Sequence, residues 1–477
     1  MGEIDMVKFI CAFEPSPGSM AARNKLMVLN AGSSSLKFRL FQLLGPAAAA
    51  STGGGSPTSP ISSASADTSS TSGGSGGPPA AREAVAAAAG LRSVASGLCE
   101  RIGDPAGGAV MKAAAHSEWR KAARQEVPMP DHAAALRQVA QFLEQAFFPT
   151  FQEEVLGVGH RVVHGGTIGE AVLVDEAAKA AIREASELAP LHNPPNLYCI
   201  EAAQQLFPDA PHVAVFDTTF HATMPQEAYT YALPAQLAAE HRIRRYGFHG
   251  ISYSYLTHEA ARRLGKPPDQ CNLVLCHLGA GSSMCAVAGG RSIETTMGFT
   301  PLEGLMMGTR CGDIDPAILT YLLGKGYSGA ELDELMNKQS GFLGLTGSID
   351  VRTVEEGALK GDEECLLALA VYLRRIRKYL GAYLVHLGGQ VDAIVFSAGI
   401  GENGSMLREL ALSGLEWAGI SVDRAANDAT VRGRSREVQA PGSRVKVFVI
   451  PTDEQLEIAE QTLRVVRRHA GQLACAA

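Results

Sequence analysis

The chain has 477 residues, of which 46% are hydrophobic and 19% charged, and its formal net charge is −7. This length and composition predict about two to four domains with large cores, whereas the negative charge provides no basic field for nucleic acid. No apolar run reaches the roughly 18 residues that a membrane span requires. Nine cysteines without a Cys-x-x-Cys pair favour free thiols in a reducing compartment over a disulfide or zinc framework.

Residues 1–24 are expected to form a flexible leader. It carries no clear secretory signal, which leaves the cytoplasm or the interior of an organelle, such as a mitochondrion or plastid, as the predicted compartment. After a strand pair over Leu26–Leu44, residues 45–80 are almost entirely Ala, Gly, Ser, Thr and Pro. Such a segment buries too little to offset its ordering entropy. We therefore expect a disordered insertion before the strand pattern resumes at Leu91, with a docking or regulatory tail as the alternative.

Three apolar runs end in glycine-rich turns that are candidate phosphate sites. The turns are Asn30-Ala-Gly-Ser-Ser-Ser35, Gly279-Ala-Gly-Ser-Ser283 and Ser397-Ala-Gly-Ile-Gly-Glu-Asn403. Glycine lets a backbone turn sharply, and unpaired amides in such a turn form an anion-binding concavity. One such turn is a weak signal, because glycine turns in hairpins are commoner than phosphate loops. The repeat of Ala-Gly-Ser-Ser at 31–34 and 280–283 favours a duplicated domain that holds a nucleotide and an acceptor between its halves.

Helix and strand patterns alternate along the remaining chain. A helix is expected over His132–Phe147, strands over Val155–Val163 and Pro211–Phe216, and a closing helix over Glu454–His469. This alternation predicts an α/β architecture, and the chain length and repeated turn favour two related domains with a cleft between them.

Polar side chains follow several apolar runs, at the strand ends where open α/β sheets place ligands. These residues are Asn30, Arg161, Asp217, His249, His277, Asp313, Asp350 and Glu402. Arg310, between glycines and close to Asp313, is a further candidate. Each has a structural alternative: Arg161 as half of an ion pair, Asp217 as a turn cap, His249 as a satisfied core histidine and Arg310 as a surface side chain.

Nine segments closely resemble, in order, the motifs of the acetate kinase family. They are Asn30-Ala-Gly-Ser-Ser-Ser-Leu-Lys37, His160-Arg-Val-Val-His-Gly-Gly166, Ala189-Pro-Leu-His-Asn-Pro-Pro-Asn196, Phe216-Asp-Thr-Thr-Phe-His221, Arg245-Tyr-Gly-Phe-His-Gly250, Gly298-Phe-Thr-Pro-Leu-Glu-Gly304, Gly308-Thr-Arg-Cys-Gly-Asp-Ile-Asp-Pro316, Ala398-Gly-Ile-Gly-Glu-Asn403 and Pro451-Thr-Asp-Glu454. The resemblance implies the duplicated ribonuclease-H-like domains, around an interdomain cleft, of acetate and sugar kinases, heat-shock chaperone ATPases and actin. Residues 25–221 and the C-terminal helix 455–477 would form the first actin-like domain. Residues 222–454 would form the second, which binds nucleotide and dimerises.

The resemblance also implies a reaction, the reversible transfer of the ATP γ-phosphoryl group to acetate, giving acetyl phosphate and ADP. Arg161 and Arg310 match two arginines that grip phosphoryl oxygens through charged, planar guanidinium groups, and Arg161 would also hold the acetate carboxylate. His249 matches a histidine that, with Arg310, stabilises the transition state. Asp217 matches an essential carboxylate near the metal and acceptor. Because acetate is already a good nucleophile, we expect Asp217 to orient groups and link to the metal rather than accept a proton.

Mg²⁺, or Mn²⁺ in its place, and ATP or ADP are implied ligands. Glu454 matches the family's magnesium ligand and Asn30 its neighbour, and both carry the hard oxygen donors that magnesium requires. The implied nucleotide-binding residues are Ser33, Ser35, Lys37, His277, Gly279, Ala280, Gly281, Ser282, Asp350, Val351, Arg352, Gly399, Ile400 and Asn403. Ala280 departs from the family, which often has Asn there, so phosphate contact at this point would rest on backbone amides.

Val163, Leu191, Phe248 and Pro301 are implied around the substrate methyl group. One methylene changes binding by only ~1–3 kcal/mol, so a propionate or butyrate kinase is an alternative that comparative kinetics would separate. The alternative from another class is an ATP-binding module of the heat-shock chaperone or actin type without an acyl acceptor. It would require a partner-binding domain or polymer contacts, and the sequence indicates neither. The resemblance further implies a homodimer, and we expect no nucleic-acid or membrane partner.

Overall fold

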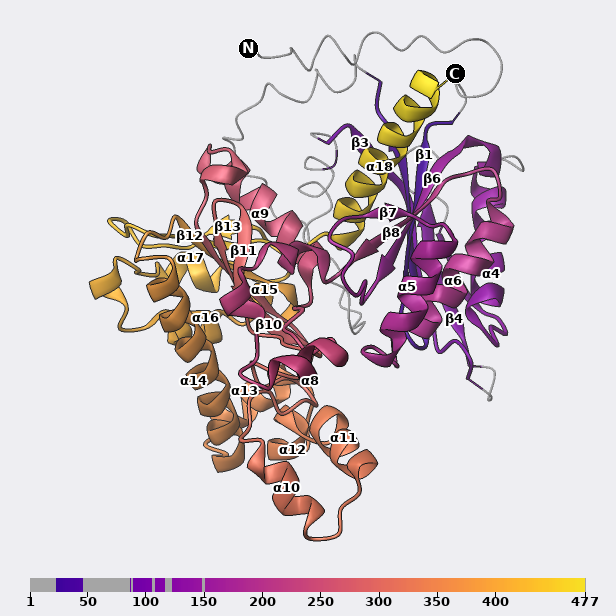
Figure 1. The fold of residues 1–477 in the computed structure, drawn as a ribbon. Coiled ribbons are helices and arrows are strands. Elements are labelled where there is room, and N and C mark those ends of the chain that lie inside the picture. Colours follow the sequence, from indigo (N-terminus) through magenta and orange to yellow (C-terminus); the bar gives the residue numbers. More distant parts are fainter. Residues whose placement is uncertain are drawn as a thin grey trace.

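The structure, a computed structural model of the chain, describes residues 23–45, 86, 89–104, 108–115, 122–147 and 151–476. Residues 1–22 of the predicted leader and residues 46–80 of the predicted insertion lie outside this part. Within it the chain forms two mixed sheets with helices packed on them (Figure 1), and the predicted α/β class is confirmed.

The first sheet has eight strands in the order β5-β4-β3-β2-β1-β6-β8-β7. Their bounds are β1 Lys25–Ala31, β2 Ser35–Leu43, β3 Leu91–Glu100, β4 Val110–Ala115, β5 Ala122–Glu126, β6 Val155–Val162, β7 Val172–Leu173 and β8 His212–Phe216. β1 to β5 form an antiparallel meander, whereas β1, β6 and β8 run parallel. The parallel strands at the centre therefore end at one edge of the sheet, where parallel sheets bind ligands.

Helices cover both faces of this sheet. α4 (His132–Ala146) and α6 (Asn193–Leu206) pack together against one face, and α5 (Glu176–Glu184) lies beside α6. α4 begins where the Asp131 carboxylate accepts a hydrogen bond from Ala134 N at 2.7 Å, which satisfies one of the free amides of the first turn. α18 (Glu454–Ala476) packs on β1, β6 and β8 from the other face.

The second sheet has six strands in the order β11-β10-β9-β12-β14-β13. Their bounds are β9 Leu273–Leu278, β10 Ser282–Ala288, β11 Arg291–Thr295, β12 Ala393–Ser397, β13 Arg436–Glu437 and β14 Lys446–Val449. β9, β12 and β14 run parallel and are buried along nearly their whole length, as expected of strands covered on both faces. α9 (Gly250–Leu264) and α14 (Glu363–His386) pack against this sheet.

The remaining helices lie around the second sheet and in the segment between β11 and β12. They are α7 Gln226–Tyr229, α8 Ala235–Glu240, α10 Ala317–Leu323, α11 Gly329–Lys338, α12 Gly341–Thr346, α13 Val351–Leu359, α15 Ala398–Asn403, α16 Ser405–Leu412 and α17 Arg424–Asp428. In Figure 1, α10 to α13 project from the end of the molecule away from α18.

One hydrophobic cluster joins the two sheets. It contains residues of β1 and β8 from the first sheet, of β9 and β12 from the second, and of the contacting helices α9 and α18. Leu456 at the start of α18 and Tyr253 in α9 are fully buried in it. The two helices therefore carry the packing that holds the strand ends of one sheet near those of the other.

The predicted elements are confirmed with small shifts of their ends. α18 continues to Ala476, past the predicted end at His469 and through Gly471, although glycine costs a helix about 1 kcal/mol relative to alanine. The seven described cysteines are free thiols. In the part of the chain that the structure describes, no helix is both long and apolar enough to span a bilayer.

Candidate active site

Arg161 and Asp217 form an ion pair at the shared edge of the first sheet. Arg161 lies near the end of β6, and Asp217 directly follows the neighbouring parallel strand β8. Arg161 Nη2 donates to Asp217 Oδ2 at 2.6 Å and Nε donates to Oδ1 at 3.2 Å. Nη1 also approaches Asn30 Oδ1, near the end of β1, at 3.4 Å. The ends of three adjacent strands thus supply one polar cluster.

A second carboxylate, Glu454, faces this pair. Burial raises the pKa of Asp217, the Arg161 guanidinium lowers it, and the Glu454 carboxylate raises it. Burial disfavours the charged form of Arg161, but Asp217 and Glu454 outweigh this cost and raise its pKa. Glu454 is held in place by its neighbour Asp453, whose two carboxylate oxygens accept hydrogen bonds from Arg39 of β2 at 2.8 and 2.7 Å.

The oxygen atoms of Asn30, Asp217 and Glu454 form a donor set that fits magnesium. Magnesium prefers hard oxygen ligands, binds through one or two carboxylates and keeps several waters. A cation between Asp217 and Glu454 would also relieve the repulsion that raises the pKa of Asp217. Among the described residues, no three His, Cys, Asp or Glu side chains gather into a metal site of their own.

The region that Arg161 and Asp217 share with His249, His277 and Arg310, whose charges act on one another, is called the slot below. Two stacked histidines occupy its side opposite the Arg161–Asp217 pair. His249, just before α9, and His277, in β9, lie with ring centroids 4.1 Å apart. His277 Nδ1 and Ser252 Oγ are 2.8 Å apart, and His249 Nδ1 and Ser283 Oγ are 2.9 Å apart. The pKa of His249 is held well below its usual range. Burial is the largest cause, and electrostatic repulsion from His277, Arg161 and Arg310 lowers the pKa further. Burial lowers the pKa of His277 to about 4, so both rings are neutral at pH 7.

The backbone of His249 is fixed in an unusual conformation beside Asp217. Its φ of 58° is in the left-handed region, which non-glycine residues adopt mainly at functional or strained positions. The next residue, Gly250, donates its amide to the Asp217 carbonyl at 2.8 Å. A Cβ at Gly250 would lie 2.1 Å from that carbonyl oxygen, so only glycine permits this approach.

Arg310 lies on the same side as the histidines, next to the second glycine turn. Its Nη1 donates to the Pro301 carbonyl at 2.9 Å and contacts Met307 Sδ at 3.5 Å. Among the described residues, no carboxylate lies within ion-pair distance of it, and burial lowers its pKa. A Cβ at Gly281 would lie 3.6 Å from both the Arg310 guanidinium and the His249 ring. The second glycine turn, His249 and Arg310 therefore meet.

The second and third glycine turns are adjacent. A Cβ at Gly279 would lie 3.5 Å from the Cβ of Ala398, the first residue of α15, whose φ is 64°. Ser282 is buried, and its hydroxyl donates to the Gly279 carbonyl and lies 3.1 Å from the Tyr372 hydroxyl. Ala280 is exposed, and its carbonyl accepts from Gly308 N at 3.1 Å, in the loop that leads to Arg310.

The other residues predicted to bind nucleotide lie at the ends of α13 and α15 and in the first turn. Val351 is in a buried cluster against which Ile400 packs, while Asp350 and Arg352 pair with each other at 2.7 Å on the surface. Asn403 Nδ2 donates to the Gly399 carbonyl at 2.8 Å. In the first turn, residues 33 and 37 are exposed and residue 35 is half-buried, so Ser33, Ser35 and Lys37 are accessible to a ligand.

Two of the four residues predicted around the substrate methyl group share one apolar cluster. Val163 and Phe248 are buried there. Pro301 is half-buried, and its carbonyl holds Arg310. Leu191 is 56% exposed and lies outside the cluster. The cluster is completed by three residues that the sequence analysis did not assign to the substrate: Ala189, Met297 and Met307.

His192 is a further residue of the slot that the sequence analysis did not assign. Burial lowers its pKa, and the positive charges of Arg161 and Arg310 lower it further, so its ring lies near both guanidinium groups. It precedes α6 in the same motif as Leu191. The sequence did contain a signal for His192: it is a histidine within the proline-containing motif 189–196, which already matched the family.

One arginine of the slot is paired with a carboxylate, and the other, half-buried, has no carboxylate partner among the described residues. This arrangement suits the transfer of an anionic group between two ligands, as in an α/β phosphotransferase. The sequence model of the acetokinase family matches residues 79–460. The chain belongs to the acetokinase family, as the nine motifs predicted.

Relatives cover nearly the whole chain. The acetate kinase of Clavibacter michiganensis subsp. michiganensis is 52% identical over 78% of this chain and 92% of its own length, and that of Methanosarcina thermophila is 42% identical over 93% and 97%. Among solved structures, Porphyromonas gingivalis acetate kinase has a TM-score of 0.77 at 36% identity, covering 93% of this chain and 100% of its own. A propionate kinase from Francisella tularensis subsp. tularensis has a TM-score of 0.76 at 33% identity, with the same coverage.

Proposed function

We propose that this chain catalyses the reversible transfer of the ATP γ-phosphoryl group to acetate, giving acetyl phosphate and ADP. Membership of the acetokinase family supports the reaction, since close relatives over most of the chain are acetate kinases. The structural observation that carries the proposal is Arg310, a half-buried guanidinium without a carboxylate partner among the described residues, beside His249 and the second glycine turn. Its positive charge is therefore available to an anionic ligand.

In this proposal the acetate lies against the first sheet. Its carboxylate faces Arg161, whose orientation is held by Asp217, and its methyl group packs against Val163 and Phe248. The pKa of Arg161 is raised, so it remains charged throughout. Asp217 is already engaged by Arg161 at 2.6 Å, which supports an orienting role rather than proton transfer.

The transferred phosphoryl group meets Arg310 and His249 from the opposite side. A hydrogen-bond relay determines the tautomer of His249 in this proposal: Tyr253 donates to Ser283 Oγ, and the Ser283 hydroxyl donates to His249 Nδ1. Nε2 then carries the proton and donates to a phosphoryl oxygen. Two donors on one side and Arg161 on the other cancel the charge of an in-line transfer, which is the main catalytic requirement of phosphoryl transfer.

Magnesium would be held by Glu454 and Asn30, with Asp217 linked to it. When bound, it would neutralise charge on the phosphate oxygens. Ser33, Ser35 and Lys37 of the first turn and Gly279, Ala280, Gly281 and Ser282 of the second would contact the phosphates, with His277 behind them. Asp350, Val351, Arg352, Gly399, Ile400 and Asn403 would surround the adenosine.

We further propose the two actin-like domains and the homodimer that the resemblance implies. The two sheets with their separate hydrophobic clusters support the division. Exposed apolar side chains on α10 and α14, among them Ile318, Tyr321 and Leu367, support a covered face on the second half. Light scattering on the purified chain would measure its mass in solution.

Trapping of acyl phosphate with hydroxylamine tests the activity directly. We expect hydroxamate only when acetate, ATP and Mg²⁺ are all present. Hydrolysis of ATP that is independent of acetate and gives no hydroxamate would instead indicate a nucleotide-operated module of the chaperone or actin type. Higher kcat/KM for propionate than for acetate would favour a propionate kinase, which the similarity to the Francisella enzyme keeps as the second candidate.

The apolar cluster predicts the effect of one substitution on this preference. Val163 is 4% exposed in contact with the cluster that would hold the methyl group. Val163→Ala removes two methyl groups and should raise kcat/KM for propionate relative to acetate by roughly 10-fold, the low end of what one methylene is worth. Val174→Ala, in a different cluster, is the matched control, and an unchanged ratio in Val163→Ala would refute the pocket.

A further inference from the structure

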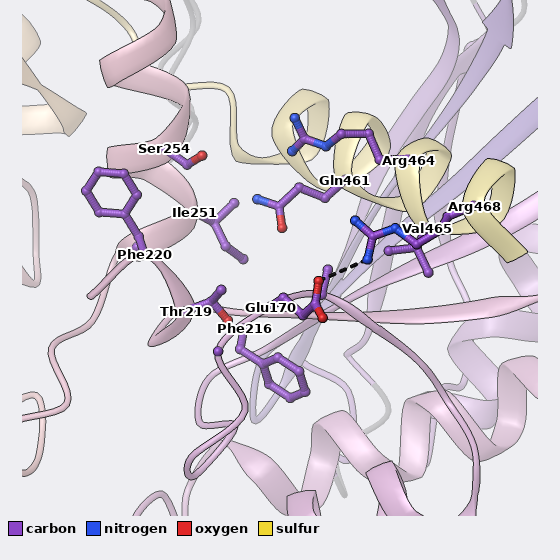
Figure 2. A pocket seen from close by; sticks show the side chains of 13 residues that line it. Glu170, Phe216, Thr219, Phe220, Ile251, Ser254, Gln461, Arg464, Val465 and Arg468 are labelled. Atoms are coloured by element: carbon purple, nitrogen blue, oxygen red, sulfur yellow. Dashed lines mark hydrogen bonds and ion pairs between the residues drawn. The ribbon is translucent and has the colours of Figure 1, made fainter. Parts of the chain in front are cut away.

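A cavity of about 220 Å³ lies behind the slot, between α18, the start of α9 and the turn after β8 (Figure 2). Its described lining includes none of the residues assigned above to acetate, metal or nucleotide. Its wall is nevertheless formed by close neighbours of two of them: Phe216 and Thr219 flank Asp217, and Gly250 follows His249. The cavity therefore adjoins the backbone that positions the slot.

Apolar and polar side chains both line the interior of the cavity, and Thr219 and Gln461 are among the polar ones. Phe216, Ile251 and Val465 contribute to its walls. Thr219 Oγ1 is buried and has no hydrogen-bond partner among the described residues. Gln461 donates through Nε2 to Glu457 at 2.8 Å, and its oxygen is directed toward the cavity in Figure 2. A buried hydroxyl without a hydrogen-bond partner destabilises the fold, because its lost hydrogen bonds to water are not replaced. A ligand that bonds to Thr219 Oγ1 would remove this cost.

The mouth of the cavity carries more positive than negative charge. Arg464 and Arg468 stand one turn apart on α18, and both side chains are more than half exposed. Arg468 pairs with Glu170 across the mouth at 3.1 Å, which is the dashed contact in Figure 2. Arg464 lies 3.6 Å from Glu457, but Glu457 already accepts hydrogen bonds from Ser254 and Gln461. Each guanidinium group thus has a carboxylate nearby, but the residues that line the cavity are two arginines and a single glutamate, Glu170, and like charges one turn apart repel.

We propose that this cavity is a second ligand site, which binds a small monocarboxylate with an apolar body. The carboxylate lies between Arg464 and Arg468, since guanidinium groups match carboxylates in shape and charge. The body lies against Phe216 and Val465. The cavity holds about seven waters at the ~30 Å³ that each occupies in the liquid, which suits a molecule of the size of benzoate and excludes a nucleotide. A compact phosphate would leave the apolar walls uncovered.

Occupation of this site reaches the slot through short backbone connections. Thr219 is two residues from Asp217, and Gly250 donates its amide to the Asp217 carbonyl at 2.8 Å. A ligand packed against both segments restrains Asp217 and His249 together. We therefore expect the ligand of this second site to change kcat at saturating acetate. Acetate does not compete with this ligand, because the two bind at different places.

Binding is tested with benzoate by calorimetry on the full chain saturated with acetate, so that the acetate position in the slot is taken. We expect binding to the wild type and to Arg467→Gln, which is exposed on the same helix and does not line the cavity. Ala171→Phe, which fills the cavity, abolishes it. Arg464→Gln and Arg468→Gln each weaken it at least fivefold. Benzyl alcohol, without the charge, and inorganic phosphate, without the body, bind at least tenfold more weakly than benzoate.

The proposal is overturned if the acetate-saturated wild type does not bind benzoate, if Ala171→Phe binds it as the wild type does, or if phosphate binds equally well. If Ala171→Phe does not fold, which circular dichroism reveals, the two arginine variants and Arg467→Gln decide the question. The assay reads binding without turnover, so its result is independent of the proposed kinase activity.

Discussion

On the side of the first glycine turn, Arg161 donates to both oxygens of Asp217 and faces Glu454 as a second carboxylate. On the side of the second turn, Arg310 contacts a carbonyl oxygen and a thioether sulfur. We call the side with Arg161 the first wall and the side with Arg310 the second wall. The positive charge of the first wall is neutralised by carboxylates of the protein, whereas that of the second wall has no carboxylate partner among the described residues. The pKa values follow the same division, raised for Arg161 by its acidic partners and lowered for Arg310 by burial.

This difference assigns different tasks to two arginines that look alike in the sequence. A paired guanidinium holds a fixed position and can orient an acceptor and its metal without a large change in charge. Arg310, half-buried and without a carboxylate partner among the described residues, keeps its charge available until the transferred phosphoryl group arrives. The second wall is therefore expected to stabilise the transition state, and the first to position the substrate.

The largest expected effect is on Arg310. Arg310→Ala removes the open charge and should lower kcat by about 10³- to 10⁵-fold, the range seen for arginines that stabilise phosphoryl transfer. Stability should stay the same or rise, because the half-buried guanidinium has no carboxylate partner among the described residues to lose. Initial rates of hydroxamate formation and urea unfolding measure the two effects, with Arg374→Ala, an exposed arginine of α14, as the control.

Arg161→Ala tests the role of the first wall. It should also lower kcat by several orders of magnitude, but it leaves Asp217 buried without its cation and should cost ~3–5 kcal/mol of unfolding free energy. Equal loss of stability in the Arg161 and Arg310 variants would contradict the division between a matched and an open wall. Near-normal turnover in either variant would remove that arginine from the reaction.

The next largest effect tests the two Ala-Gly-Ser-Ser turns. Ser283 of the second turn is buried between the His249 ring and the Tyr253 hydroxyl, whereas Ser34 of the first is exposed. Ser283→Ala leaves two buried polar groups without their shared partner and should cost ~1–3 kcal/mol. It should also lower kcat about 10-fold, because His249 loses the bond that fixes its tautomer.

Ser34→Ala is the matched control, and its stability should change by less than about 0.5 kcal/mol, as for most surface substitutions. Both variants are measured by urea unfolding and by initial rates at saturating substrate. If the two substitutions had the same effect on stability, the serines of the two turns would be equivalent, and the relay through Ser283 would be wrong.

These turns also show which part of the site could be predicted from sequence. Each was correctly predicted to lie between two strands, because apolar runs bounded by glycines are a local signal. The residue-for-residue match does not persist in the structure: Ala31 is the last residue of β1, but Ala280 lies two residues beyond the end of β9. Equivalent positions are therefore offset by two residues, and identical serines became exposed in one turn and buried in the other.

The residues that the sequence analysis did not find act through contacts between distant segments. Ser283 is 34 positions from His249, and Met297 and Met307 join Val163 only when the two halves are folded together. No local period or turn signal encodes such contacts. Leu191 was assigned from the family resemblance alone, because the irregular turn before α6 has no alternating pattern that shows which side chains point inward. In the structure Leu191 is exposed, and its neighbour His192 lies near the two arginines.

The smallest expected effect concerns the stacked histidines of the second wall. The pKa of His277 is about 4 in the folded chain and close to 6.5 in an unfolded one. Between these values the unfolded chain binds a proton that the folded chain does not, so stability is fully present above pH 6.5 and declines as the pH falls toward 4. From pH 6.5 to 5, His277 should account for at most about 2 kcal/mol of this loss, at 1.36 kcal/mol per pH unit.

His277→Asn removes this titration while retaining a side chain that can hydrogen-bond to Ser252. Urea unfolding at pH 5 and pH 7 should give a smaller difference for this variant than for the wild type, by about 1–2 kcal/mol. His241→Asn, at an exposed position, should leave the wild-type difference unchanged. If His277→Asn lost as much stability as the wild type on acidification, His277 would not be the neutral, desolvated ring that we expect next to His249. The contrast between the two walls would then rest on Arg310 alone.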